Sequence, residues 1–229
     1  MNICLIAATG AEIPSFVSQI PDFQGQLILG IYTFNYREGL TLTILLTGVG
    51  ITHATYQITD ALNKNKFDLC VQAGICGAFD RNILIGEVVE VKAEKNAQSG
   101  AEDGEIFIDI FELGLQNNNE FPYRDGWIEN EVKPYPSLKQ IQKVKAITVE
   151  TVHGNNESIN RTIRKYNPTI ESMEGSAFFY CCSMKNIPFL QIRAVSNYVE
   201  KRNKANWNIP LAVENLNTFL IQLFNEITA

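Results

Sequence analysis

The sequence predicts an α/β fold in which a central, mixed and mostly parallel β-sheet is covered by helices on both faces. Short apolar runs typical of buried strands alternate along the chain with amphipathic stretches typical of helices. The chain has 229 residues, of which 45% are apolar and 19% are charged, an ordinary balance for a globular protein. This length is enough for one large core, so we expect residues 1–229 to form a single domain.

The predicted strands are compact apolar runs, several of which end in glycine-containing segments. They cover residues 2–8, 40–47, 67–73, 85–91, 145–149 and 189–194. The second of these strands ends at Gly48-Val49-Gly50 and the third ends at Gly74-Ile75-Cys76-Gly77.

The predicted helices alternate with these strands, as the fold class requires. They cover residues 52–62, 156–164, 175–184 and 212–227. In the first helix one face collects the apolar side chains of Ala54, Ile58, Ala61 and Leu62. Residues 95–136 are polar, with clusters of Gly, Asn and Pro, and we expect a long irregular loop with a functional role.

The net charge of −6 argues against a nucleic-acid-binding protein, which would need a basic surface to displace counterions. It leaves open a small ligand that carries no phosphate. The chain begins with a short apolar run that has no basic leader, and no apolar run is long enough to cross a membrane. We therefore expect a cytoplasmic protein with no membrane partner.

The cysteines are odd in number and none forms a CxxC pair, so we expect buried, reduced thiols and no disulfide framework. They are Cys4, Cys70, Cys76, Cys181 and Cys182. His53 and His153 are the only histidines, and we expect both to be structural and no metal to be bound.

Several polar residues follow predicted strands. In open α/β sheets the ligands gather at the carboxyl ends of the strands. Glu12, Gly48, Gly74 and the segment after Arg193 all fall at such ends. This convergence predicts a ligand site at one edge of the sheet.

Each of these residues also has a purely structural interpretation. Glu12 follows Thr9 at the spacing of a capping box, and Glu174 could complement a helix dipole. Asn197 could belong to a turn. Gly48-Val49-Gly50 lacks the third glycine of a dinucleotide fingerprint, which favours a tight turn and no nucleotide cofactor.

Four segments taken together resemble one enzyme superfamily. They are ATGAE (8–12), AGICGAFDRNILIGEVVEV (73–91), ESMEGSAF (171–178) and RAVSN (193–197). This set resembles the purine nucleoside phosphorylase/hydrolase superfamily, in particular the branch of methylthioadenosine/S-adenosylhomocysteine nucleosidases and futalosine hydrolases. The resemblance implies a small-molecule nucleoside substrate, no cofactor, and a homodimer or larger homo-oligomer.

The resemblance also implies the roles of the residues that act at the ribose. Cleavage of a ribosyl N–C bond separates charge between an oxocarbenium-like sugar and the departing base, so the site must stabilise that separation. Glu174 matches the carboxylate that binds the ribose hydroxyls, and Met173 would pack on the sugar. Glu12 matches the general base for water, and Arg193 matches an arginine beside it.

The remaining residues that the resemblance assigns to substrate binding line the ribose and the base. They are Gly74, Ile75, Cys76, Gly77, Val152, Ser196 and Trp207. Trp207 would either close the site or anchor the last helix.

Two further choices concern the reaction and the base. The first loop carries the acidic Glu12 and no arginine. Such a loop would repel phosphate, which favours hydrolysis over phosphorolysis. Adenosine-type members carry an aspartate where this chain has Asn197. An asparagine can donate to a 6-oxo oxygen and accept from a protonated N7, which matches hypoxanthine or guanine.

Further segments resemble the futalosine hydrolases specifically. They are GAEDGEIFIDIFELGL (100–115), FPYRDGW (121–127), TVETVHG (148–154) and RAVSNYVEKRNKANWNIPLA (193–212). The implied reaction releases hypoxanthine and dehypoxanthinyl futalosine, in menaquinone biosynthesis. The aromatic-rich region 100–127, from this or a neighbouring subunit, could cover the 5′ group, and Arg124 or Arg202 could pair with its carboxylate.

Other functions remain open at this point. A methylthioadenosine/S-adenosylhomocysteine nucleosidase and a 6-oxopurine nucleoside phosphorylase are the enzymatic alternatives. A non-catalytic nucleoside-binding or sensor protein is the alternative of another class, although the presence of Glu12, Glu174 and Arg193 together argues against it.

Overall fold

The computed structural model describes residues 1–21, 23, 25–130 and 135–227. Its strands are β1 (Asn2–Ala7), β2 (Gly30–Arg37), β3 (Leu40–Leu46), β4 (Leu69–Ala78), β5 (Val88–Asn96), β6 (Gly100–Asp103), β7 (Ile106–Asp109), β8 (Tyr123–Arg124), β9 (Trp127–Glu129), β10 (Gln142–Thr148), β11 (Ile170–Ser172) and β12 (Phe189–Tyr198). Its helices are α1 (Pro14–Val17), α2 (Ile51–Lys64), α3 (Asn156–Tyr166), α4 (Gly175–Met184) and α5 (Ile209–Ile227). Short 3-10 turns cover Gly10–Glu12, Ser137–Lys139 and Lys204–Asn206.

The predicted α/β fold is confirmed, with corrections to individual elements. β4 continues through the glycine-rich run to Ala78, and β12 continues to Tyr198, so both strands extend beyond their predicted ends. β5 begins at Val88 and not at residue 85. The prediction of an irregular loop over 95–136 was wrong in part, because β6 to β9 lie within it; residues 131–134 fall outside the described part of the chain.

The sheet is mixed. Its long inner ladders, β1–β3, β1–β4, β10–β5 and β12–β4, are parallel. β12 pairs with β4 on one side and antiparallel with β5 on the other. β5 also pairs with β10, β10 with β11, and β11 with β4. Together with β12, these four strands therefore form a closed ring of paired strands.

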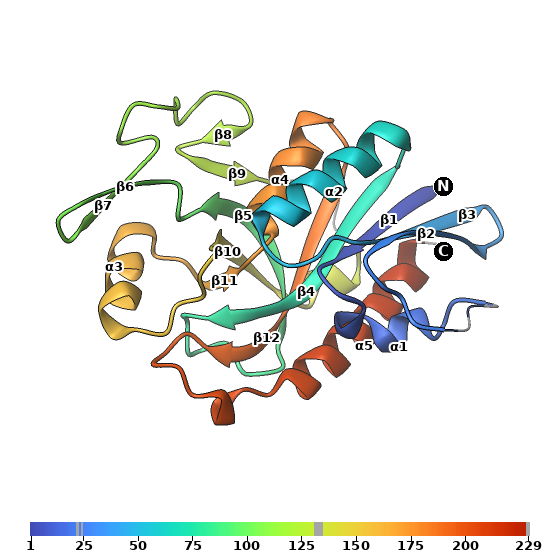
Figure 1. Cartoon of the computed structure of the whole chain (residues 1–229). Helices are drawn as coiled ribbons and strands as arrows, with labels where there is room; N and C mark the ends of the chain where they lie inside the picture. The colour runs from blue at the N-terminus through green and yellow to red at the C-terminus, as the bar shows by residue number, and fades with distance from the viewer. Residues whose placement is uncertain (22, 24, 131–134, 228–229) are drawn as a thin grey trace.

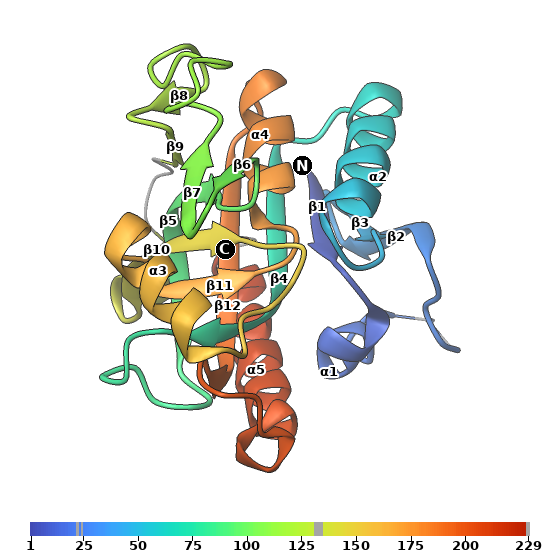
Figure 2. The same cartoon turned by 60° about the vertical axis from the view of Figure 1, so that its left-hand side comes forward.

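Helices cover both faces of the sheet (Figures 1 and 2). Side chains along β1 alternate between the two faces, and both sets are apolar, so each face needs a covering layer. Ile3 and Leu5 belong to the core beneath α1 and α5, and Cys4 and Ile6 belong to the core beneath α2 and α4. All five cysteines are buried, as predicted. In the part of the chain that the structure describes, no helix is both long and apolar enough to cross a membrane.

Candidate active site

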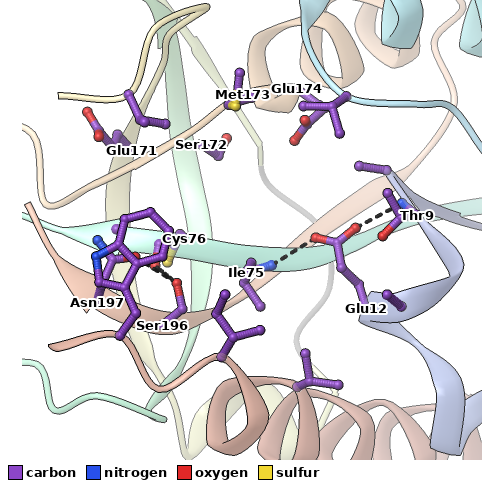
Figure 3. A pocket seen from close by; sticks show the side chains of 18 of the residues that line it. Thr9, Glu12, Ile75, Cys76, Glu171, Ser172, Met173, Glu174, Ser196 and Asn197 are labelled. Atoms are coloured by element: carbon purple, nitrogen blue, oxygen red, sulfur yellow. Dashed lines mark hydrogen bonds between the residues drawn. The ribbon is translucent and has the colours of Figure 1, made fainter. Parts of the chain in front are cut away.

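A cavity of about 410 Å³ lies where β1, β4, β11 and β12 approach their carboxyl ends (Figure 3). The residues that the resemblance assigns to the ribose, the base and catalysis line this cavity, apart from Gly74 and Arg193; Gly48, which the strand-end pattern also placed at the site, does not line it. These two residues pack directly behind the wall that Glu12 and Ile75 form.

Glu12 lies at one end of the cavity, in the 3-10 turn that follows β1. Its carboxylate accepts hydrogen bonds from the backbone N–H groups of Thr9 at 3.0 Å and Ile75 at 3.2 Å (Figure 3). Burial raises the pKa of Glu12, which Arg193 lowers and Glu174 raises further, with a net increase. A carboxylate that is more basic than usual suits the role of a general base.

Arg193 lies beside Glu174, and its charge also acts on Glu12. Its side chain is buried; Nη2 lies 3.6 Å from Glu174 Oε2, and Nη1 donates to the Ile75 carbonyl at 3.3 Å. Gly74 leaves the room for this, because a Cβ there would collide with Arg193 Nη1 and lie 2.8 Å from Glu12 Oε1. Among the described residues the buried Nη2 has no hydrogen-bond partner, and the Glu174 carboxylate is the charge it lies beside.

Glu174 occupies the N-cap position of α4, but its side chain does not cap that helix. Its Oε1 instead accepts the backbone N–H of Gly50, at 3.1 Å, immediately before α2. The N–H of Ile51, the first residue of α2, donates to Glu150 Oε1 at 2.8 Å. Carboxylates of the protein itself therefore satisfy the positively polarised N-terminus of α2.

The opposite end of the cavity contains Asn197 and Glu171, one on each side of Gly77. Glu171 of β11 and Asn197 of β12 are both in register with Gly77 of β4. A Cβ at Gly77 would lie 3.3 Å from Asn197 Nδ2 and 3.6 Å from Glu171 Cγ, so both side chains flank the same point. Gly77 therefore gives room to the carboxamide, the carboxylate and the Val199 side chain, whose Cγ2 would lie 3.0 Å from that Cβ.

Hydrogen bonds orient the Asn197 amide. Ser196 Oγ donates to Asn197 Oδ1 at 2.8 Å, and Asn197 Nδ2 donates to the Tyr198 carbonyl at 3.0 Å. This arrangement leaves the second N–H of Nδ2 for a ligand, while Oδ1 keeps a second lone pair.

Glu171 is hydrogen-bonded to His153. This glutamate is not among the residues predicted for the site. Its Oε1 accepts the backbone N–H of His153 at 3.0 Å, and its Oε2 lies 2.5 Å from His153 Nδ1. His153 Nε2 in turn lies 2.9 Å from Thr162 Oγ1. His153 thus orients a buried carboxylate that lines the cavity, and His153 lines the cavity as well; its expected structural role stays a prediction. The only signal in the sequence was a glutamate two residues before Met173.

Trp207 and Arg202 belong to the end of the cavity that holds Asn197. The Arg202 guanidinium packs over the Trp207 ring at 4.9 Å, and both residues line the cavity. The backbone N–H of Asn208 donates to the Ser196 carbonyl at 2.8 Å, which ties this segment to β12 beside Asn197.

The region 100–127 lies apart from the cavity within the single chain. None of its described residues lines the cavity. Arg124 is largely exposed and lies 3.4 Å from the Glu129 carboxylate. A contribution of this region from a neighbouring subunit stays a prediction.

Comparison with known proteins identifies the family. Residues 2–225 match the family described as the phosphorylase superfamily. The chain is 26% identical to a futalosine hydrolase from Thermus thermophilus, over 78% of this chain and 79% of the relative. It is 22% identical to a 5′-methylthioadenosine/S-adenosylhomocysteine nucleosidase from Glaesserella parasuis, over 98% of this chain and 99% of the relative.

The fold is also that of solved structures. The futalosine hydrolase of Helicobacter pylori superposes with a TM-score of 0.80, at 13% identity, over 99% of this chain and 98% of the other. Since the family match extends over nearly the whole sequence, the chain belongs to the phosphorylase superfamily.

Proposed function

We propose that the protein is a futalosine hydrolase, which uses water to release hypoxanthine from futalosine and leaves dehypoxanthinyl futalosine. Relatives named nucleosidases or hydrolases support the general activity, that of an N-glycosyl hydrolase acting on a small-molecule nucleoside. Three arguments, concerning the nucleophile, the ribose and the base, support the more specific proposal.

The observation that best supports hydrolysis is at the N-terminus of α2, where carboxylates of the protein already accept the backbone N–H groups. Helix N-termini are common phosphate sites because their backbone N–H groups and dipole attract anions. Here Glu174 and Glu150 already accept the N–H groups of Gly50 and Ile51. A phosphate at this end would also face the Glu12 carboxylate, and the positive charge of Arg193, behind the wall, is already offset in part by Glu174 at 3.6 Å. Water is the nucleophile that such a site accommodates.

The ribose end supplies the groups that N-glycosidic cleavage needs. The Glu174 carboxylate can accept hydrogen bonds from ribose hydroxyls and places negative charge near the developing oxocarbenium ion. Met173, on the cavity wall, offers an apolar surface to the sugar. Glu12, with its raised pKa, accepts a proton from the attacking water, and Arg193, packed behind the cavity wall, supplies positive charge close to Glu12 and Glu174.

The base end favours a 6-oxopurine. Hypoxanthine presents an acceptor at O6 and a donor at N1–H, whereas adenine presents a donor at the 6-amino group and an acceptor at N1. The open N–H of Asn197 suits O6, and the Glu171 carboxylate on the other side of Gly77 suits an N–H donor. Adenine would turn its 6-amino donor toward the N–H donor of Asn197 and its N1 acceptor toward the carboxylate acceptor of Glu171, so neither hydrogen bond could form.

A 5′-methylthioadenosine/S-adenosylhomocysteine nucleosidase is the second candidate, because relatives and solved structures with that name match nearly the whole chain. The two candidates differ in the base released and in the 5′ group accepted.

The test of the proposed reaction is base release with and without inorganic phosphate, followed by chromatography. We expect hypoxanthine from futalosine at the same rate in both conditions and little release from inosine, which lacks the 5′ substituent. Phosphate-dependent cleavage of inosine would instead establish a phosphorylase.

A further inference from the structure

A row of fully buried polar side chains leads from Arg193 away from the cavity. Arg193 Nε donates to Gln191 Oε1 at 3.1 Å, and Gln191 Nε2 donates to Glu94 Oε2 at 3.2 Å. Gln191 and Glu94 are both fully buried, at 0% exposure. Neither residue lines the proposed active site, so substrate binding alone does not account for them.

The other oxygen of Glu94 leads to helix α4. Thr148 Oγ1 donates to Glu94 Oε1 at 2.8 Å and accepts the backbone N–H of Ser176 at 2.7 Å. Ser176 lies in the first turn of α4, two residues after Glu174. Glu94 is thus connected to the guanidinium beside Glu12 and also to the helix turn that follows the proposed ribose-binding carboxylate.

The hydrogen-bond directions in this row are fixed by chemistry. An arginine side chain only donates, and an ionised carboxylate only accepts. Gln191 must therefore turn its oxygen to Arg193 and its nitrogen to Glu94. Gly175 is part of the arrangement, because a Cβ there would collide with Glu94 Oε2 and lie 2.8 Å from Gln191 Nε2.

We infer that Glu94 is a positioning residue for the reaction proposed above, acting through Gln191 on Arg193 and through Thr148 on the first turn of α4. Without Glu94, the Gln191 amide loses its fixed orientation and the Arg193 guanidinium loses the restraint at Nε. The distances among Arg193, Glu174 and Glu12 then vary, and these distances determine how the water and the ribose are held.

The charge at Glu94 belongs to the same arrangement. Burial raises the pKa of Glu94 to about 7, although Thr148, Arg193, Gln191 and the backbone N–H of Lys95 each lower it. Burial raises the pKa of the nearby Cys76 thiol to about 12; the charge of Arg193 lowers this pKa and the charge of Glu94 raises it. Near neutral pH this carboxyl can therefore hold or release a proton while the hydrogen bond from Gln191 remains.

Substitutions by methionine, which keeps the side-chain length and removes the hydrogen bonds, test the inference. We expect Glu94→Met and Gln191→Met each to lower kcat about 10- to 100-fold, with KM changed by less than about threefold. The double variant should be no slower than the slower single variant, because both substitutions interrupt one row of contacts. Glu94→Gln should restore most of kcat, since its carbonyl can accept from Gln191 and its N–H group can donate to Thr148.

Glu90→Met is the matched control. Glu90 is a buried carboxylate on the same strand, β5, and its backbone lies opposite Ile192, but its side chain pairs with Lys92 at 3.1 Å and not with Gln191 or Arg193. We expect this variant to keep the kcat of the unmodified protein. Full kcat in Glu94→Met and in Gln191→Met, or losses that multiply in the double variant, would overturn the inference.

The two proposals can fail separately. If the unmodified protein does not cleave futalosine, the proposed function fails, and the variants are then compared with methylthioadenosine as substrate. The Glu94 row contacts the ribose end and not the base end, so the same losses are expected with either nucleoside. If the unmodified protein cleaves futalosine and Glu94→Met and Gln191→Met do so equally well, only the positioning role fails.

Discussion

Glu12 shows how one residue can satisfy two interpretations that compete in the sequence. The Thr9–Glu12 spacing predicts a capping box, and Glu12 does accept the backbone N–H of Thr9. The same carboxylate also accepts the N–H of Ile75 and faces the cavity beside Arg193. A capping contact therefore fixes the orientation of the proposed base, and does not exclude catalysis.

We predict that Glu12→Gln preserves nucleoside binding and lowers turnover by about 100-fold or more, as expected for loss of a general base. The glutamine carbonyl can still accept from Thr9, so the turn should be retained. Titration calorimetry with substrate and steady-state kinetics measure the two effects. Near-normal turnover would show that another group activates the water.

We predict that Asn197→Asp reduces the preference for 6-oxo over 6-amino nucleosides by about 10- to 100-fold. An aspartate can still accept from Ser196 Oγ, but it cannot donate to O6 and it can accept from a 6-amino group. The ratio of kcat/KM for the two kinds of nucleoside is the measurement. An unchanged ratio would place base recognition elsewhere, with Glu171 as the next residue to substitute.

At the scale of the elements, β4 connects the two ends of the site. The strand predicted from the sequence ends at residue 73, before the glycine-containing run Gly74-Ile75-Cys76-Gly77. The structure continues the strand, because β12 pairs with it on one side and β11 reaches Gly77 and Ala78 on the other. These pairings join segments about 100 residues apart in sequence, and local composition does not reveal them.

We predict that Gly74→Ala lowers turnover about 100-fold or more while the protein stays folded, because small misplacements of catalytic groups carry large costs. The added Cβ would displace Arg193 Nη1 and crowd Glu12 Oε1. Steady-state kinetics and the unfolding midpoint measure activity and folding. Unchanged turnover would mean that these two side chains can move without affecting the reaction.

For the whole molecule, sequence patterns predict the elements whose side chains fill the core. The runs that became β1, β3 and β10, and the helices α2 and α4, were found with small boundary errors. β11 has only three residues, and the exposed edge strand β2 lacks a compact apolar run, so neither was predicted. The resemblance to a family assigned ten of the residues that line the cavity, but it gave no role to Glu171, which lines it, or to Glu94, which lies behind it; the partners of these two glutamates come from other strands and loops.

The buried Glu94 predicts a pH dependence of stability. Its pKa rises from an ordinary 4.5 to about 7 in the folded protein, so the folded state holds this proton more tightly than the unfolded state. The resulting stabilisation is complete below about pH 4.5 and is lost as pH rises through about 7, with an upper limit of roughly 3 kcal/mol. The Glu94→Gln variant has no proton to lose at this position, so it lacks this pH-dependent stabilisation. We expect urea unfolding to show the unmodified protein losing stability relative to the variant over this range; a constant difference would contradict the prediction.

The central claim is that this site selects a 6-oxopurine nucleoside with a large 5′ group and hydrolyses it. The most direct test is the ratio of kcat/KM for futalosine to that for methylthioadenosine, measured in phosphate-free buffer. Complementary hydrogen bonds at Asn197 and Glu171 predict a ratio of about 10³ or more in favour of futalosine. A ratio near or below one, with adenine as the main product, would contradict the proposed substrate and identify the protein as an adenosine-type nucleosidase.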